Sequence, residues 1–266
     1  MAAGISSRMK RSLLLDISSS EVEQLSKTLM GLGKNDRPLL LYLLDHAKQA
    51  GYTDIFLVVG QRYVAFQEIF GDQISNNEYQ DLKIHYAIQS IPNERTKPLG
   101  TADAVFQALE QYTQLRESTF SICNSDNLYS VAAFKALQHD DHENAMIRYD
   151  RKGLLYDQEK ISKFALLNVD DAGFLIDIIE KPTSLVSEKT QWVSMNLFKL
   201  YGPMVYPYLR DCPLNPIRKE KELPTALLNM CRENDQALIT IPRSEHVPDL
   251  TQKEDIDSIN DFLNDG

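Results

Sequence analysis

The chain of 266 residues is long enough for one large α/β domain with its own hydrophobic core. Acidic residues number 38 against 28 Lys and Arg, and the formal net charge of −10 argues against a nucleic-acid partner, because phosphate backbones are bound through basic surfaces. No apolar run approaches the ~20 residues that a membrane span needs, so we expect no membrane partner.

Helices and strands are predicted to alternate in the first half of the chain. Residues 11–26 are serine-rich and acidic, which is typical of a surface excursion with a short helix. Apolar spacing and turn residues then predict a helix over 38–50 ended by Gly51, a buried strand over 54–60, a strand over 82–89, a helix over 101–111 capped by Thr101, a strand over 120–123, a helix over 131–138 and a strand over 145–149. This order indicates an α/β fold with a mostly parallel sheet and helices on both faces.

The second half is predicted to contain a hairpin and further single elements. Strands over 164–169 and 174–179 flank the turn 170–173. The remaining elements are a strand over 192–200, a short helix over 204–209 interrupted by Pro207, a helix over 224–232, a strand over 237–241 and a helix over 254–263. Since no linker divides these elements, we expect a single domain over residues 1–266.

The first residues are predicted to form a loop with the chemistry of a phosphate site. Ala2, Ala3 and Gly4 have little bulk, so their N–H groups can approach phosphate oxygens, and Arg8 offers a planar fork that binds them bidentately. An ordinary turn is the alternative. Because such a loop normally leaves a buried strand, we expect the first strand to lie upstream of Met1.

Cysteine and histidine give no metal-binding pattern. The chain has 3 cysteines without metal-ligand spacing, which favours reduced thiols and a cytoplasmic protein. The cluster His139-Asp140-Asp141-His142 resembles a metal site, but adjacent side chains point in different directions. We interpret it as a solvated helix end.

Polar groups follow several of the predicted strands, and in α/β sheets ligands gather beyond the carboxyl ends of strands. Gln89 ends one strand, Asp126 follows another, and Glu180 with Lys181 ends a third. Read alone, Asp126 could instead cap the next helix, and Glu180 with Lys181 could form a surface ion pair.

Several short motifs resemble those of sugar-1-phosphate nucleotidyltransferases and occur in that family's order, from residue 2 to about residue 200. They are Ala2-Ala3-Gly4 with Arg8-Met9, Lys27-Thr28-Leu29-Met30 before Arg37-Pro38, Tyr86-Ala87-Ile88-Gln89 followed by Pro98-Leu99-Gly100-Thr101, Asp126-Asn127, and Glu180-Lys181-Pro182. The resemblance implies a Rossmann-like nucleotidyltransferase fold. Its nucleotide-binding half would cover about 1–150 and its acceptor half about 151–266.

The resemblance also implies a reaction, in which a sugar 1-phosphate oxygen attacks the α-phosphate of a nucleoside triphosphate and pyrophosphate leaves. Arg8 would hold the outgoing pyrophosphate, and Lys27 would lie between the phosphates. Asp126 would hold Mg²⁺, with Asp249 as the second carboxylate on that metal. From spacing alone, Lys27 could be a solvated helix lysine and Asp249 an acid at a helix N-terminus.

Recognition of the two substrates would fall to residues at later strand ends. Gln89 would read a nucleobase edge, and Gly100 with Thr101 would let the base lie against backbone. Glu180 would take sugar hydroxyls, Lys181 the sugar phosphate, and Asn196 would line the acceptor site.

The sequence departs from the family pattern at a few positions. Ser6 replaces the second glycine of the phosphate loop, Ser125 replaces the glycine before Asp126, and Leu197 replaces the glycine expected after Asn196. The last two lie near the acceptor and leave its identity open. The nucleobase is open as well, because Gln89 and Gly100 can serve uracil, thymine, cytosine or a purine. Two alternatives are a cytidylyltransferase acting on phosphocholine or another alcohol phosphate, and a nucleotide-binding homologue without turnover. Homo-oligomers are common among related enzymes, but no exposed patch can be identified from the sequence. The oligomeric state is therefore left open.

Overall fold

A computed structural model describes residues 31–61, 63–71, 82–180, 182, 190–252 and 254–265, without the side chains of residues 65, 69 and 265. The chain divides into two compact units, drawn from 1–52, 123–135 and 246–266 and from 53–122 and 136–245. We describe each unit by itself. Within the described residues, no helix is long and apolar enough to cross a membrane.

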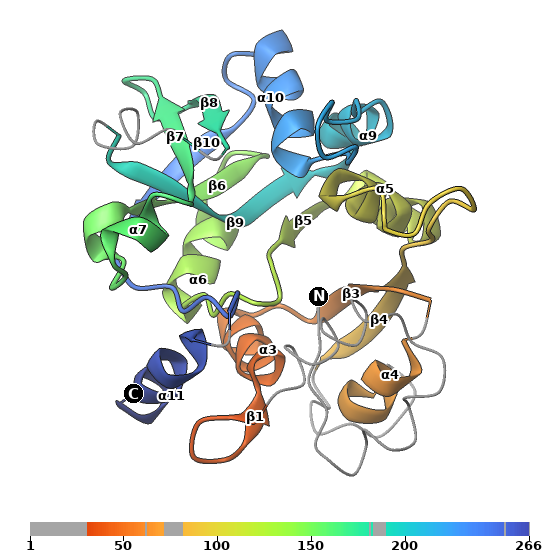
Figure 1. Ribbon diagram of the computed structural model, residues 1–266. Coiled ribbons are helices and arrows are strands. Elements are labelled where there is room, and N and C mark those ends of the chain that lie inside the picture. The colour runs from red at the N-terminus through yellow and green to blue at the C-terminus, as the bar shows by residue number, and fades with distance from the viewer. Residues whose placement is uncertain are drawn as a thin grey trace. The chain divides into compact units, whose positions relative to one another are not determined.

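The first unit is built on two helices and a short hairpin (Figure 1). Its described elements are β1 (Gly31–Leu32), β2 (Arg37–Pro38), α3 (Leu39–Ala50), the beginning of α6 (Val131–His139) and α11 (Asp255–Asp265). Helix α3 begins directly after Pro38 and ends at Gly51, whose φ of 101° belongs to the left-handed region that glycine favours. Helix α11 is tied to the hairpin, since Gly33 N donates to Asn260 Oδ1 at 2.7 Å.

The second unit holds the larger sheet and its covering helices (Figure 1). Its elements are β3 (Asp54–Val59), α4 (Val64–Phe70), β4 (Lys83–Ile88), α5 (Thr101–Gln111), a 3-10 turn (Thr113–Glu117), β5 (Thr119–Ile122), the rest of α6, β6 (Ala145–Asp150), a 3-10 turn (Arg151–Gly153), α7 (Gln158–Ile161), β7 (Ala165–Val169), β8 (Leu175–Ile179), β9 (Trp192–Tyr201), α9 (Gly202–Arg210), α10 (Leu223–Glu233) and β10 (Ile239–Arg243). The alternation of helices and strands predicted from the sequence is confirmed.

The described strands form a mixed sheet organised around β9. The strand order is β10-β6-β9-β7-β8, with β5 also paired to β9. Strand β10 is parallel to β6, whereas β5, β6 and β7 all run antiparallel to β9. Strands β5, β6, β7 and β10 therefore share one direction, and β9 reverses it. Strands β3 and β4 form a separate parallel pair.

A continuous apolar core lies between this sheet and helices α5, α9 and α10. Phe198 and Leu200 of β9, Val205 and Leu209 of α9, and Leu227 of α10 are fully buried in it. Helix α10 also packs on α9, α5 and β8, which holds the three helices as one layer against the sheet (Figure 1). Since apolar burial is the main driving force for folding, this core fixes the strand ends that carry the predicted site residues.

Some local predictions are corrected by the structure. Pro207 does not interrupt its helix, because α9 runs through it between the fully buried Val205 and Leu209. Strand β3 is predicted to be buried, yet only Val59 of its residues is buried, and Asp54 at its start is exposed. The last strand lies at 239–243, displaced from the expected 237–241.

Candidate active site

Asp126 and Asp249 lie on two chain segments of the first unit that pair with each other. Asn127 and Asp249 form an antiparallel β-bridge. Leu250 N donates to Asp126 O at 2.8 Å, and Leu128 N donates to Pro248 O at 2.9 Å. The two acids, far apart in sequence, are thereby brought onto adjacent backbone segments, which meets the first requirement for a shared metal ion.

The segment that carries Asp126 is held by buried polar contacts. Tyr129 is fully buried, and its hydroxyl donates to Asn127 Oδ1 at 3.2 Å and accepts from Asn124 N at 3.3 Å. The Tyr129 carbonyl lies 2.7 Å from His46 Nδ1 on α3. Neither Tyr129 nor His46 belongs to a sequence motif, so these contacts could not be predicted from the sequence. Their role is to fix the backbone beside Asp126.

Asp249 is a buried acid with a local donor. Only 6% of its surface is exposed, and the Thr251 hydroxyl lies 2.7 Å from Oδ1 and 2.9 Å from Oδ2. The Asp255 carboxylate at the start of α11 in turn accepts from the N–H groups of Thr251 and Gln252 at 3.0 and 2.7 Å. The segment is thus held from both ends, and Asp249 is not an acid at the helix N-terminus, a position that Asp255 takes.

Two carboxylates are a suitable donor set for Mg²⁺. This cation prefers carboxylate oxygens and usually keeps several waters or phosphate oxygens, so it does not need a third protein ligand. The described residues contain no group of three or more His, Cys, Asp or Glu side chains placed to hold a metal ion. A magnesium site at Asp126 and Asp249 would therefore rely on substrate phosphates for its remaining ligands.

Gln89 and Gly100 meet in the second unit. Gln89 is 8% exposed, and its Nε2 donates to Gly100 O at 3.0 Å and to Asp103 Oδ2 at 2.9 Å. Gly100 has φ of 113°, and a Cβ there would lie 2.5 Å from Lys221 O. Glycine is therefore required at this turn for two reasons, backbone conformation and close approach of a neighbouring chain segment.

Thr101 does not cap its own helix as predicted. Helix α5 begins at Thr101 after Gly100, without a side-chain cap. The Thr101 hydroxyl instead accepts from Leu223 N at 2.9 Å, in the first turn of α10. Thr101 thus satisfies a donor of a different helix and fixes the turn before α5 against α10.

Helix α5 also clamps the edge of β4 through two glutamines. Gln111 pairs with both backbone groups of Ile88 at 2.8 and 2.9 Å, and Gln107 does the same with Ser90 at 2.8 and 3.2 Å. Gln89, between these two residues, donates its own N–H to Val59 O of β3 at 2.8 Å. Asp103, Gln107 and Gln111 recur at four-residue spacing, a polar stripe typical of a solvent-facing surface, so this role could not be predicted from the sequence.

Glu180 has a cationic neighbour that the sequence analysis missed. Arg218 Nη2 lies 4.0 Å from Glu180 Oε2 and 2.6 Å from Glu222 Oε1. Glu222 is buried and its Oε2 accepts from Asn215 Nδ2 at 3.0 Å. Glu180 is exposed and lies beside the ion pair of Arg218 and Glu222.

Asn196 lies in an irregular stretch of β9. Its φ is 57°, in the left-handed region, and the register shifts so that one residue of β6, Ile147, faces three of β9, residues 195–197. Asn196 N donates to Ser194 Oγ at 3.2 Å. The family pattern has its glycine one position later, at residue 197, but Asn196 itself adopts the backbone conformation that glycine favours.

The remaining predicted site residues lie outside the described residues. These are the phosphate loop and its cations, together with the lysine after Glu180: Ala2, Ala3, Gly4, Arg8, Lys27 and Lys181. The surface excursion expected at 11–26 also lies outside them.

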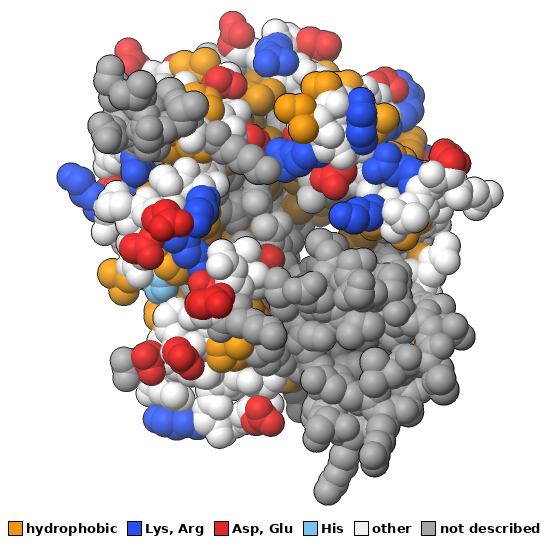
Figure 2. Space-filling model, viewed as in Figure 1, with side chains coloured by type: hydrophobic (Ala, Val, Ile, Leu, Met, Phe, Trp, Pro, Cys, Tyr) orange, Lys and Arg blue, Asp and Glu red, His pale blue; other side chains and the backbone are white. Residues whose placement is uncertain are grey.

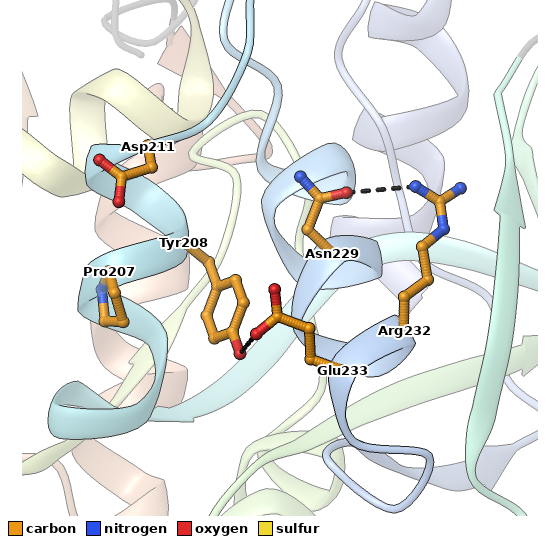
Figure 3. Close-up of a pocket in the computed structure, with 6 residues that line it drawn as sticks. All are labelled: Pro207, Tyr208, Asp211, Asn229, Arg232 and Glu233. Carbon is orange, nitrogen blue, oxygen red and sulfur yellow. Dashed lines mark hydrogen bonds between the residues drawn. The ribbon is translucent and has the colours of Figure 1, made fainter.

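A pocket of about 420 Å³ between α9 and α10 is lined by none of the predicted site residues. Figure 3 shows Tyr208 pointing toward Glu233, to which its hydroxyl donates at 2.7 Å. Arg232 donates to Asn229 Oδ1 at 3.1 Å. Because these polar groups satisfy one another, the pocket offers little unsatisfied chemistry to a ligand.

The His139–His142 cluster is a local turn. Asp140 Oδ1 accepts from His142 N and lies 3.0 Å from His142 Nδ1, within one surface segment at the end of α6. On the face shown in Figure 2, acidic and basic side chains of the described residues are interspersed. The coloured part of that face, which the described residues form, presents no broad basic surface of the kind that a nucleic acid requires.

Comparison with known proteins gives a family match over most of the chain. Residues 21–264 match the family described as nucleotidyl transferase. A curated relative, the D-glycero-alpha-D-manno-heptose 1-phosphate guanylyltransferase of Campylobacter jejuni, is 23% identical over 147 residues, or 55% of this chain. The match spans about half of that relative's length, 56%.

Two solved structures share the fold, each with a TM-score of 0.68 and 16% sequence identity. One is a Bacillus anthracis protein assigned as a glucose-1-phosphate thymidylyltransferase and solved with sucrose, with 91% of this chain and 87% of that chain covered. The other is a UDP-glucose pyrophosphorylase with UDP-glucose, with 98% and 95% covered. The predicted α/β fold of this class is confirmed.

Proposed function

Because this chain belongs to the nucleotidyl transferase family, we propose that it transfers a nucleotidyl group from a nucleoside triphosphate to a sugar 1-phosphate and releases pyrophosphate. The observation that carries the proposal is the pairing of the segments that hold Asp126 and Asp249. Mg²⁺ in phosphoryl-transfer sites is bound through one or two carboxylates together with substrate phosphates. The N-terminal turns of the two nearby helices have other acceptors, since Ser130 Oγ accepts from Ala133 N at 3.0 Å in α6 and Asp255 lies at the start of α11.

The comparisons support the same class of reaction. The relative is named a heptose 1-phosphate guanylyltransferase, and the two structures are named a glucose-1-phosphate thymidylyltransferase and a UDP-glucose pyrophosphorylase. They differ in base and in sugar, so they support the reaction more strongly than either substrate.

The protein's work in this reaction is positioning and charge neutralisation. Mg²⁺ held by Asp126 and Asp249 would neutralise phosphate charge. Lys27 would serve several phosphate oxygens at once, and Arg8 would hold the departing pyrophosphate. The loop Ala2-Ala3-Gly4 would offer backbone N–H groups to the phosphates.

Residues of the second unit would recognise the substrates. Gln89 and Gly100 would contact the base, with Thr101 fixing the turn that carries Gly100. Glu180 would accept sugar hydroxyls, Lys181 would bind the sugar phosphate, and Asn196 would line the acceptor site. The proposal also places the reaction in the cytoplasm, for which the three free cysteines are the supporting observation.

The decisive experiment measures pyrophosphate release by the full chain with Mg²⁺. Each common nucleoside triphosphate is paired with a panel of sugar 1-phosphates and with phosphocholine. Release with a sugar 1-phosphate supports the proposal. Release with phosphocholine alone would move the protein to the cytidylyltransferase alternative, and nucleotide binding without release from any pair would identify a homologue without turnover.

Substitution of Lys27 tests the phosphate site directly. Lys27→Ala should lower turnover by orders of magnitude while the thermal unfolding midpoint stays near that of the unmodified chain. Lys163→Ala is the matched control, since Lys163 is 58% exposed and pairs only locally with Glu159 at 2.9 Å. Equal activity of the two variants would exclude Lys27 from the phosphate site.

A further inference from the structure

Arg148 of β6 is a half-buried cation without an anionic partner in the part of the chain that the structure describes. Its Nε is buried and has no hydrogen-bond acceptor there. Its Cζ lies 4.5 Å from the centroid of the Trp192 ring, so the indole covers one face of the guanidinium. Burial lowers the pKa of the Arg148 side chain, and no neighbouring carboxylate raises it. Because a cation removed from water needs an anion in compensation, these surroundings favour an anionic ligand.

The single acid of β6 is engaged elsewhere. Asp150 lies two residues beyond Arg148, which puts both residues on the same face of the strand. Asp150 Oδ1 accepts from Lys152 N at 2.9 Å, and Asp150 Oδ2 accepts from Gln191 Nε2 at 3.0 Å. The Asp150 carboxylate therefore serves the turn after β6 and the approach to β9, and the charge of Arg148 stays uncompensated.

Strand pairing places Arg148 in a row with two small side chains. Arg148 lies opposite Ser194 of β9, and Ser194 lies opposite Ala165 of β7. Opposed residues of antiparallel strands share a face of the sheet, so the three side chains lie on one face in neighbouring strands. Since neighbouring strands are about 4.8 Å apart, this row extends roughly 10 Å across the sheet from β6 to β7.

Glu180 follows at the far end of the same row. Leu166 of β7 pairs with Ile179 of β8, and Ala165 and Glu180 are the next residues in that register. Glu180 is exposed and has a cation beside it, since Arg218 Nη2 lies 4.0 Å from Glu180 Oε2. The row therefore has a carboxylate near a cation at one end and a cation without a carboxylate at the other.

The irregular stretch of β9 adjoins this row. Regular pairing of β6 with β9 resumes at Arg148 and Ser194, directly beside residues 195–197. Asn196 N donates to Ser194 Oγ at 3.2 Å, which ties the irregular stretch to the row. Glu180 and Asn196 are the two described residues that we propose for the acceptor, so Arg148 lies in the acceptor half of the site.

We infer that the acceptor is a sugar 1-phosphate with a second negative group, a carboxylate, which Arg148 binds. This inference rests on the proposed function, in which Glu180 and Asn196 face the acceptor. A carboxylate fits because the planar guanidinium offers parallel N–H donors to its two oxygens, and Trp192 holds that plane by stacking. A neutral hydroxyl would accept a hydrogen bond but would leave the charge of Arg148 uncompensated.

Two matched pairs of acceptors test the inference. Glucuronic acid 1-phosphate differs from glucose 1-phosphate only in a carboxylate on C5, and galacturonic acid 1-phosphate differs from galactose 1-phosphate in the same way. Calorimetry measures their affinities for the full chain with Mg²⁺ and α,β-methylene analogues of the nucleoside triphosphates, which bind without transfer. We expect the acidic member of at least one pair to bind roughly ten- to a hundredfold more tightly, as for one charge-assisted hydrogen bond.

Three results would overturn the inference. They are equal affinity within both pairs, tighter binding of the neutral members, and failure of all four sugar phosphates to bind.

Substitutions of Arg148 assign the preference to this side chain. Arg148→Gln should bring the ratio of affinities within the preferred pair close to one by weakening the acidic member alone. Arg148→Lys keeps the charge without the planar fork and should retain part of the ratio. Arg232→Gln is the matched control, because it removes the same charge from an exposed position on α10 and should keep the full ratio. Thermal unfolding checks that each variant folds.

The pattern of losses separates the carboxylate from the phosphate that all four sugars carry. If Arg148→Gln weakens both members of a pair by the same factor, Arg148 binds the shared phosphate and the inference is wrong. An unchanged ratio in a folded Arg148→Gln variant also contradicts it.

Affinity and turnover together separate this inference from the proposed function. Tighter binding of an acidic sugar 1-phosphate, without pyrophosphate release when true triphosphates are supplied, supports the inference and contradicts the function. Pyrophosphate release with a neutral sugar 1-phosphate as the better substrate of each pair supports the function and contradicts the inference.

Discussion

Asn196 combines a backbone role with a proposed substrate contact, and the two can be separated. Its φ of 57° is costly for most side chains, while asparagine tolerates the left-handed region and glycine adopts it freely. Asn196→Gly should therefore match or exceed the stability of the unmodified chain, whereas Asn196→Ala should lose about 1 kcal/mol. Urea unfolding of the two variants measures the difference.

The same two variants test the acceptor role. Both remove the amide, so both should raise the KM for the sugar 1-phosphate by a similar factor, although only Asn196→Ala is destabilised. If Asn196→Gly keeps its KM, the residue serves the backbone of β9 and not the substrate.

Asp126 and Asp249 should behave as a pair. Asp126→Asn and Asp249→Asn each remove a charge from the proposed Mg²⁺ site, and we expect turnover to fall roughly 100-fold or more, as for other preorganised transition-state contacts. Higher Mg²⁺ concentrations should restore part of the activity, because the amide still offers one oxygen ligand. Steady-state pyrophosphate release over a Mg²⁺ titration measures both effects.

Asp171→Asn is the control for this pair, since Asp171 is an exposed acid in the turn between β7 and β8. Its activity and Mg²⁺ dependence should not change. A shift in Mg²⁺ dependence as large as that of Asp126→Asn would attribute the effect to net charge and not to ligation.

At the scale of elements, Thr101 connects the beginnings of two helices. Its hydroxyl accepts from Leu223 N at 2.9 Å, and Leu223 is 5% exposed, so loss of the hydroxyl leaves a donor with little access to water. Thr101→Val should lower the free energy of unfolding by about 1 kcal/mol, the usual cost of a lost helix cap. Thr101→Ser should retain most of the stability, and chemical denaturation compares the two.

A further comparison concerns the β-branched side chain of Thr101. If Thr101→Ser loses as much stability as Thr101→Val, packing of the methyl group and not the hydrogen bond connects the helices. The hydroxyl would then have no part in fixing the turn at Gly100.

Element boundaries followed from the sequence where local chemistry decides them. Helix α3 ends at Gly51 because that residue adopts the left-handed conformation, and the β7–β8 hairpin turns at Gly173 with φ of 95°. Pro207 was misread because tertiary packing of α9 outweighs the lost backbone hydrogen bond. The bulge at Asn196 and the long pairing of β9 depend on contacts distant in sequence, which no local pattern reports.

At the scale of the whole molecule, the candidate site residues could be predicted from the sequence, but the residues that hold them in place could not. Motif order singled out Gln89 and Gly100, and the structure brings them into contact. The contacts of Asp103 and Gln107 with Gln89 and Ser90 were not predicted, because a polar stripe on a helix ordinarily faces water. The ion pairs of Arg218 with Glu180 and Glu222 were not predicted either, because these residues are brought together by the fold and not by a local sequence pattern.

The buried thiol of Cys231 should make the free energy of unfolding depend on pH in the alkaline range. The residue lies on α10, is 5% exposed, and its burial raises the pKa of the thiol from 9.0 to about 11. Below pH 9 the thiol is protonated in both folded and unfolded chains, and its linkage contribution to stability is fully present. As pH rises from 9 through 11 the unfolded chain loses this proton first, so that contribution is lost.

Substitution isolates this contribution from the other groups that titrate in alkali. The free energy of unfolding of Cys231→Ala should differ from that of the unmodified chain by a constant amount below pH 9, and the unmodified chain should then lose stability faster up to pH 11. Leu227→Val on the same helix removes buried volume without a titrating group, so its difference from the unmodified chain should stay constant throughout. Parallel pH profiles for all three proteins would contradict this prediction. They would mean that the Cys231 thiolate is as well stabilised in the folded chain as in the unfolded chain, although a thiol buried in apolar surroundings has a raised pKa.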